Sequence, residues 1–192
     1  MDIVLVHPEI PHNTGCAARL AAALGVRLHL VEPLGFSLED RYLKRAGLDY
    51  WPMVDLVVHA DWESACEVLG GQSARSLDER LALFTARGGV SLFERAFEPD
   101  DVLVFGSESR GLPAELLAAL PAARVYLPIR ESVRSLNLAN VVAVGLYTAL
   151  HRAGVALPDN AGRYVPHPDR AVDLRAADVA QRSRRGPEIE PQ

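Results

Sequence analysis

Short, mostly apolar runs alternate along the chain with longer segments in which apolar residues recur at helical spacing. The runs have four to six residues, as expected for strands buried on both faces of a parallel sheet. Such alternation predicts an α/β fold, with a mostly parallel sheet flanked by helices. The predicted strands are 3–6, 27–31, 54–59, 81–85, 102–105 and 124–127.

Residues that start and stop helices lie between these runs. Polar side chains that accept hydrogen bonds from backbone N–H groups mark the starts, and glycines mark several ends. The predicted helices run from Asn13 or Thr14 to Leu24 before Gly25, from Ser37 to before Gly47, over 62–69 after Asp61, over 113–120 with Pro113 in the first turn, and over 137–153.

The predicted helix 137–153 carries a wide apolar stripe that includes small residues. Packing against the sheet explains this stripe, and a subunit interface is a compatible addition because a wide stripe can serve both. From about Leu157 the sequence turns to Pro, Asp and Arg with little apolar periodicity. We therefore expect one domain over 1–156 and a disordered or loosely attached tail over 157–192.

Composition narrows the class of protein. The chain has 192 residues and is 49% hydrophobic, which suits one domain with a substantial core. The two cysteines form neither a disulfide framework nor a Cys-x-x-Cys pair, which favours a reducing compartment. No apolar run approaches a membrane span and no signal peptide precedes the first strand, so we expect a cytoplasmic protein without membrane contact. A net charge of −5 argues mildly against a protein that coats nucleic acid.

Several common motifs are absent from the sequence. The first strand is not followed by Gly-x-Gly-x-x-Gly, and there is no Gly-x-x-x-x-Gly-Lys-Ser/Thr loop, Gly-x-Ser-x-Gly elbow or His-x-x-x-His spacing. Interpretations as a hydrolase or a metalloenzyme lose most of their support, and no metal is expected. Three turns that follow apolar segments are unusual instead, at 13–19, 105–113 and 127–140. Ligands in open α/β sheets bind beyond the carboxyl ends of strands, so these loops could converge on one site.

The three turns resemble the motifs of the SPOUT methyltransferases. They read Asn13-Thr-Gly-Cys-Ala-Ala-Arg19, Phe105-Gly-Ser-Glu-Ser-Arg-Gly-Leu-Pro113 and Leu127-Pro-Ile-Arg-Glu-Ser-Val-Arg-Ser-Leu-Asn-Leu-Ala-Asn140, and they occur in the family's order. The resemblance spans roughly 1–152 and is closest to the TrmL branch, the tRNA wobble-nucleotide 2′-O-methyltransferases. Further matching text is Pro8-Glu-Ile-Pro11, Glu32-Pro-Leu-Gly-Phe36 and Arg45-Ala-Gly-Leu-Asp-Tyr50.

The resemblance implies a fold and a cofactor that composition alone does not suggest. It implies a C-terminal deep trefoil knot, a rare exception to the rules of chain connection, that holds S-adenosylmethionine as methyl donor. It also implies a homodimer with the active site completed across the interface, and a tRNA anticodon loop as substrate. By similarity, the cofactor-binding residues are Phe84, Thr85, Gly106, Glu108, Leu127, Ile129, Ser135, Leu136 and Asn137.

The resemblance also implies the catalytic residues Arg19, Ser135, Asn137 and Tyr147. Arginine stays protonated in proteins and is a poor proton acceptor. We therefore expect Arg19 to orient the reacting groups and to act electrostatically, with the proton leaving through a phosphate or water.

Structural alternatives stay open for several of these residues. Gly106 could be an ordinary turn glycine, and Glu108 could pair with Arg110 to stabilise its loop. Ser135 and Asn137 could simply cap the last helix. For the whole protein, the alternatives are methylation of another tRNA or ribosomal-RNA position, or a non-catalytic RNA-binding protein that retains the fold.

Overall fold

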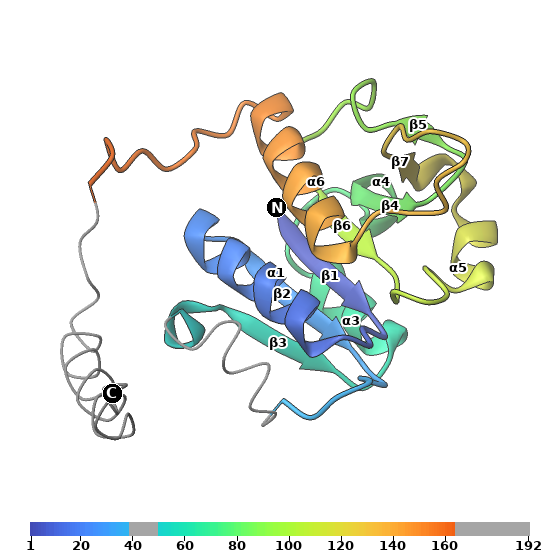
Figure 1. Cartoon of the computed structure of the whole chain (residues 1–192), viewed down its shortest axis with the longest axis horizontal. Coiled ribbons are helices and arrows are strands. Elements are labelled where there is room, and N and C mark those ends of the chain that lie inside the picture. The colour runs from blue at the N-terminus through green and yellow to red at the C-terminus, as the bar shows by residue number, and fades with distance from the viewer. Residues whose placement is uncertain (39–49, 164–192) are drawn as a thin grey trace, which may run out of the picture. The chain divides into compact units, whose positions relative to one another are not determined.

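The structure is a computed structural model that describes residues 1–38 and 50–163 of the chain (Figure 1). Met1–Leu157 form one compact unit, and the second unit begins at Pro158. The helix predicted from Ser37 to before Gly47 lies outside the described residues, as does most of the predicted tail. The division at 156/157 therefore stays a prediction. No helix in the described ranges is long and apolar enough to cross a membrane.

Seven strands form one sheet in which every neighbouring pair is parallel, as the alternating pattern predicted. The order across the sheet is β3-β2-β1-β6-β4-β7-β5. Strands β2 and β3 follow β1 toward one edge of the sheet, and the later strands lie on the other side of β1. The strands are β1 (Asp2–Val6), β2 (Arg27–Val31), β3 (Leu56–His59), β4 (Leu81–Thr85), β5 (Val90–Ser91), β6 (Val102–Phe105) and β7 (Arg124–Tyr126).

Helices cover both faces of this sheet. Because side chains alternate along a strand, Ile3 and Leu5 of β1 enter one core cluster while Val4 and Val6 enter the other. The first cluster lies under α1 and α6, which run side by side in Figure 1, and the second lies under α3 and α5. The helices are α1 (Pro11–Leu24), α3 (Trp62–Gly70), α4 (Leu77–Arg80), α5 (Ala114–Ala119) and α6 (Leu138–Arg152), with 3-10 turns η1 (Trp51–Met53) and η2 (Pro121–Ala123).

The predicted helix starts are right at two places and wrong at two. Asp61 caps α3 by accepting a hydrogen bond from the Ser64 backbone, and Asn137 caps α6 in the same way through Asn140. Helix α1 begins earlier than predicted, after Ile10, because Pro11 needs no N–H partner in the first turn. Asn13 is therefore not a cap but a buried residue inside the helix. Pro113 precedes α5 as its N-cap instead of lying in its first turn.

Two short elements, β5 and α4, were not predicted, and two strands, β3 and β7, were predicted too long. Strand β5 has only two residues and α4 only four, too few to show a periodic pattern. Strand β3 begins at Leu56, two residues later than expected, because η1 occupies the preceding chain. Strand β7 ends at Tyr126, and Leu127 already belongs to the loop at the edge of the sheet.

Two histidines form a buried pair between β2 and β3. His29 Nδ1 and His59 Nε2 are 2.8 Å apart, and both side chains are almost fully buried. Burial, followed by the neighbouring His59 and Arg27, lowers the pKa of His29 from 6.5 to about 4. Burial also lowers the pKa of His59. These histidines therefore belong to the core and remain neutral in the folded state.

We expect this pair to make folding sensitive to acid. Below about pH 6.5 the unfolded chain binds protons on these imidazoles, whereas folded His29 binds one only near pH 4. The free energy of unfolding should therefore fall as the pH drops from 6.5 to 4, by up to about 1.4 kcal/mol per pH unit and histidine. Urea unfolding at pH 7, 5.5 and 4.5 measures this slope. The variant His29→Gln keeps a polar side chain without a titrating group, so an unchanged slope in it would contradict the assignment.

Candidate active site

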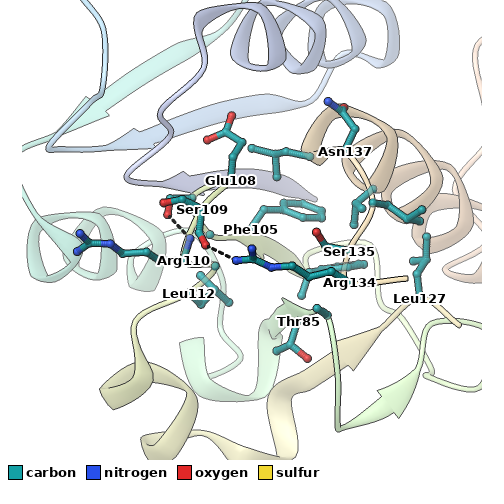
Figure 2. A pocket seen from close by; sticks show the side chains of 18 of the residues that line it. Thr85, Phe105, Glu108, Ser109, Arg110, Leu112, Leu127, Arg134, Ser135 and Asn137 are labelled. Atoms are coloured by element: carbon teal, nitrogen blue, oxygen red, sulfur yellow. Dashed lines mark hydrogen bonds between the residues drawn. The ribbon is translucent and has the colours of Figure 1, made fainter. Parts of the chain in front are cut away.

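A cavity of about 630 Å³ opens at the carboxyl edge of the sheet, beyond β4, β6 and β7 (Figure 2). It lies where the strand order changes direction, the usual place for a ligand in an open α/β sheet. Its volume falls in the range of small-molecule and cofactor sites. The loops 105–113 and 127–137 provide most of the wall, as the sequence predicted, and α6 closes it with Leu138 and Val141.

Every residue predicted to hold the cofactor lines this cavity. These residues come from three strand ends that are far apart in the sequence, and parallel pairing brings those ends to one edge. They are Phe84, Thr85, Gly106, Glu108, Leu127, Ile129, Ser135, Leu136 and Asn137. Their contact with a cofactor stays a prediction, but the structure assembles them in one place.

Two stacked rings form the apolar floor of the cavity. The rings of Phe84 and Phe105 lie 4.4 Å apart between centroids. Gly145 of α6 touches this stack, since a Cβ built there would lie 2.9 Å from Cζ of Phe84. The small residues noted in the stripe of α6 therefore let the helix approach the rings closely.

Gly106 allows the loop after β6 to fold back on itself. A Cβ at this position would collide with the backbone of Gly111 and Leu112. Ser107 and Gly111 exchange two backbone hydrogen bonds of 3.1 and 2.8 Å, and Gly111 has a positive φ of 73°. The structure shows that Gly106 admits the returning chain of its own loop, and the suggested close approach to a ligand stays a prediction.

The carboxylate of Glu108 points toward α1 (Figure 2). It accepts hydrogen bonds from the backbone N–H groups of Glu9 at 2.8 Å and Ile10 at 3.3 Å, and from Nδ2 of Asn13 at 2.9 Å. The alternative interpretation paired Glu108 with Arg110, but the carboxylate instead satisfies the N–H groups at the start of α1. Glu108 thus joins the loop after β6 to the loop after β1.

A second contact between the same two loops runs in the opposite direction. The carboxylate of Glu9 accepts hydrogen bonds from Oγ of Ser109 at 2.6 Å and from its backbone N at 3.0 Å. The Ser109 hydroxyl bond is the main reason that the pKa of Glu9 lies below its usual range. Arg134 then crosses the cavity mouth and donates to the Ser109 carbonyl oxygen at 3.1 Å (Figure 2). Three loops are therefore held together around the cavity.

The four predicted catalytic residues fall into two groups. Ser135 and Asn137 line the cavity, whereas Arg19 and Tyr147 do not. Arg19 lies exposed on α1 with its guanidinium 5.0 Å from the ring centroid of Tyr50. Tyr147 lies on the exposed side of α6, where it lines a separate hollow with Phe93 and His151. Within one chain, the structure does not bring all four together.

Asn13 and Arg134 are among the residues of the cavity wall that sequence reasoning missed. The sequence indicated Asn13 as a possible helix cap and as the first residue of the first motif, and it gave Arg134 no role at the site. The signal for Asn13 was its place at the head of the first motif, because a buried asparagine inside a helix needs partners for its amide. In the described part of the chain, no three His, Cys, Asp or Glu side chains are grouped as metal ligands.

Comparisons with known proteins agree with the motifs. The profile of the SpoU rRNA Methylase family matches residues 1–147. A tRNA (cytidine(34)-2'-O)-methyltransferase of Methylovorus glucosotrophus is 50% identical over 149 residues, which cover 77% of this chain and 92% of that protein. A protein of the same name from Burkholderia ambifaria is 47% identical over 154 residues, covering 80% and 96%.

Solved structures give the same grouping. One described as "Structural insights into the 2-OH methylation of C/U34 on tRNA" is 48% identical, covers 80% of this chain and 95% of its own, and has a TM-score of 0.72. An AdoMet-bound rRNA methyltransferase of Sinorhizobium meliloti is 22% identical with a TM-score of 0.67, covering 78% of this chain and 55% of its own, and shares the fold.

A parallel sheet covered on both faces, with a cofactor-sized cavity in the loops at its carboxyl edge, defines an α/β enzyme that binds a small molecule. The family match specifies the enzyme further. The chain belongs to the SpoU rRNA Methylase family, which confirms the resemblance to the SPOUT methyltransferases.

Proposed function

We propose that the protein transfers a methyl group from S-adenosylmethionine to the ribose 2′-hydroxyl of the wobble nucleotide, cytidine or uridine 34, of tRNA. One observation carries this proposal above the others. The three motif loops meet around a single cavity in a chain that is about half identical, over nearly their whole length, to tRNA (cytidine(34)-2'-O)-methyltransferases. The protein is thus an enzyme of tRNA processing, and we place it in the cytoplasm.

The cavity suits the proposed cofactor. An adenosyl group needs apolar surface for the face of its base and backbone groups for its edge. The wall offers Leu127, Ile129 and the Phe84–Phe105 stack for the first need, and the loop backbone around Gly106 and Leu136 for the second. When bound, S-adenosylmethionine supplies a methyl group that the positive charge of its sulfonium activates for transfer.

The residues of the chain have two tasks in this reaction. They must hold the ribose hydroxyl in line with the methyl group, and they must provide a route for the proton that the hydroxyl loses. Ser135 and Asn137 lie at the cavity and suit the first task. Arg19 stays protonated, so it orients the nucleotide electrostatically while the proton leaves through a phosphate or water.

The active enzyme in this proposal is a homodimer. Arg19 and Tyr147 do not line the cavity of their own chain, so a second copy is needed to bring such groups to the cofactor. Exposed Val144 and Tyr147 give α6 an apolar outer surface, which suits a subunit interface. The substrate contact is the anticodon loop, where single-stranded nucleotides expose their 2′-hydroxyls.

We also include a deep trefoil knot in the proposal. Strand β7 follows β4 and β5 in the chain, yet it lies between them in the sheet. The loop that leaves β7 then forms the cavity wall before α6. A knot forms when a C-terminal segment is threaded through an earlier loop of the chain. Threading of this kind requires a late strand to be inserted between earlier ones, as β7 is.

Two measurements test the function together. Calorimetric titration of the purified protein with S-adenosylmethionine should show saturable binding, as an active methylase requires. Mass mapping of ribose methylation in tRNA should show that modification at nucleotide 34 disappears when the gene is deleted and returns with the wild-type gene. Binding without any change at nucleotide 34 would favour another tRNA or ribosomal-RNA position, and absence of binding would favour a non-catalytic RNA-binding protein.

A further inference from the structure

A chain of side-chain hydrogen bonds links the three motif segments in the wall of the cavity. Glu108 Oε1 accepts a bond of 2.9 Å from Asn13 Nδ2, and Asn13 Oδ1 accepts a bond of 3.0 Å from Asn137 Nδ2. Asn137 Oδ1 then accepts the backbone N–H of Asn140 at 3.3 Å, which caps α6. Asn13 is the middle member and is only 3% exposed.

The two ends of this chain fix the direction of every bond in it. An ionised carboxylate only accepts hydrogen bonds, so Asn13 must turn its NH₂ group toward Glu108. Its oxygen then faces Asn137, which must present its own NH₂ group in turn. At the far end, the backbone N–H of Asn140 only donates, which requires the oxygen of Asn137. Both ends therefore demand the same orientation of both amides.

We propose that Asn13 is a positioning residue for the methyl-transfer site. Because its NH₂ group must face Glu108, its oxygen faces Asn137, and this fixes the orientation of the Asn137 amide at the cavity wall. This inference rests on the proposed function and deepens it. Asn137 then holds one end of the loop 132–137 against α1 while it starts α6. Glu108 acts through this chain, with its carboxylate directed at α1 and Asn13 rather than at the adenosyl group.

The structure suggests variants that break the chain and one that repairs it. In Asn13→Asp, two carboxylates meet where a donor faced an acceptor, so the contact becomes repulsive until one of them binds a proton. In Glu108→Gln, the NH₂ group of the new amide must face either Asn13 or a backbone N–H just before α1. Two donors then face each other. In the double variant Asn13→Asp/Glu108→Gln, the new amide donates to the new carboxylate, and that carboxylate also accepts from Asn137. The amide oxygen introduced at position 108 still accepts from the backbone of Glu9.

The test measures the dissociation constant of S-adenosylmethionine by calorimetry for the four proteins, at pH 8 and pH 6. Each single variant should bind about tenfold more weakly at pH 8, and the double variant should return to within about threefold of the wild type. Affinity of Asn13→Asp should recover at pH 6, where the carboxyl pair can share a proton, while the wild type changes little. Gln72→Glu adds the same charge at an exposed site just after α3 that does not line the cavity, and it should bind as the wild type does.

The outcomes separate the two hypotheses. If the wild type does not bind S-adenosylmethionine, the proposed function fails. If the wild type binds and the double variant loses affinity as the sum of the singles, with no pH effect in Asn13→Asp, only the positioning role of Asn13 is overturned. Should a single variant fail to fold, as judged by thermal unfolding, the double variant decides: recovery of fold and affinity supports the role, and failure to fold overturns it.

Discussion

Gly106→Ala is expected to weaken S-adenosylmethionine binding by about 100-fold, corresponding to about 3 kcal/mol. The added methyl group collides with backbone atoms of Gly111 and Leu112, which have no rotamer that moves them aside. The loop must open, and the two backbone bonds between Ser107 and Gly111 are then strained or lost. Because this loop forms one wall of the cavity, its displacement should affect the cofactor before it affects the core of the sheet.

Calorimetry measures the affinity, and thermal unfolding monitors the fold. The matched control is Gly70→Ala at the end of α3, where the added Cβ would meet nothing within 4 Å. That variant should bind S-adenosylmethionine as the wild type does. A Gly106→Ala protein that bound within about threefold of the wild type would show that the close approach is not needed for the site.

The α/β architecture was predictable because local patterns of apolar residues indicate the strands and helices. Strands buried on both faces are mostly apolar, and runs of this kind predicted six of the seven strands. The strand order was not predictable in this way, since nothing local states that β7 lies between β4 and β5. Long-range pairing of that kind depends on the whole core, and the family resemblance implied a knot but no strand order.

The residues predicted to bind the cofactor line one cavity, and their contact with a cofactor stays a prediction, but several of them make contacts that the sequence did not suggest. Gly106 accommodates its own loop and Glu108 faces α1. The residue type alone predicts neither of these contacts. Asn13 resembles a cap in the sequence because capping preference is local, while its actual partners lie 95 and 124 residues away along the chain. Such partners become visible only when the strand ends are assembled.

The position of Arg19 is the largest difference between expectation and structure. The motif groups it with Ser135 and Asn137, yet it lies exposed on α1 and does not line the cavity of its own chain. A site that needs all three residues therefore needs a second copy of the protein. In the expected homodimer, one subunit would then supply the cavity with Ser135 and Asn137, and the other would supply Arg19.

Arg19→Ala is therefore expected to lower kcat for tRNA methylation by about 10²- to 10³-fold, the usual effect of removing an electrostatic group from an active site. Affinity for S-adenosylmethionine should change by less than about twofold, because the side chain does not contribute to the cavity wall. Arg19→Lys keeps the charge but not the planar guanidinium, so near-full activity in it with unchanged tRNA binding would exclude a specific guanidinium role.

A heterodimer of Arg19→Ala and Gly106→Ala subunits tests the shared site directly. If Arg19 of one subunit serves the cofactor cavity of the other, one of the two sites in this heterodimer contains an intact loop and an intact arginine. Co-expression with two different tags and sequential purification isolates it. At a concentration of S-adenosylmethionine near the dissociation constant of the wild type, its methylation rate should reach about half that of the wild type, although both parent homodimers are nearly inactive under this condition. If each subunit carried a complete site, both sites would contain one defect, and the heterodimer would remain as inactive as its parents.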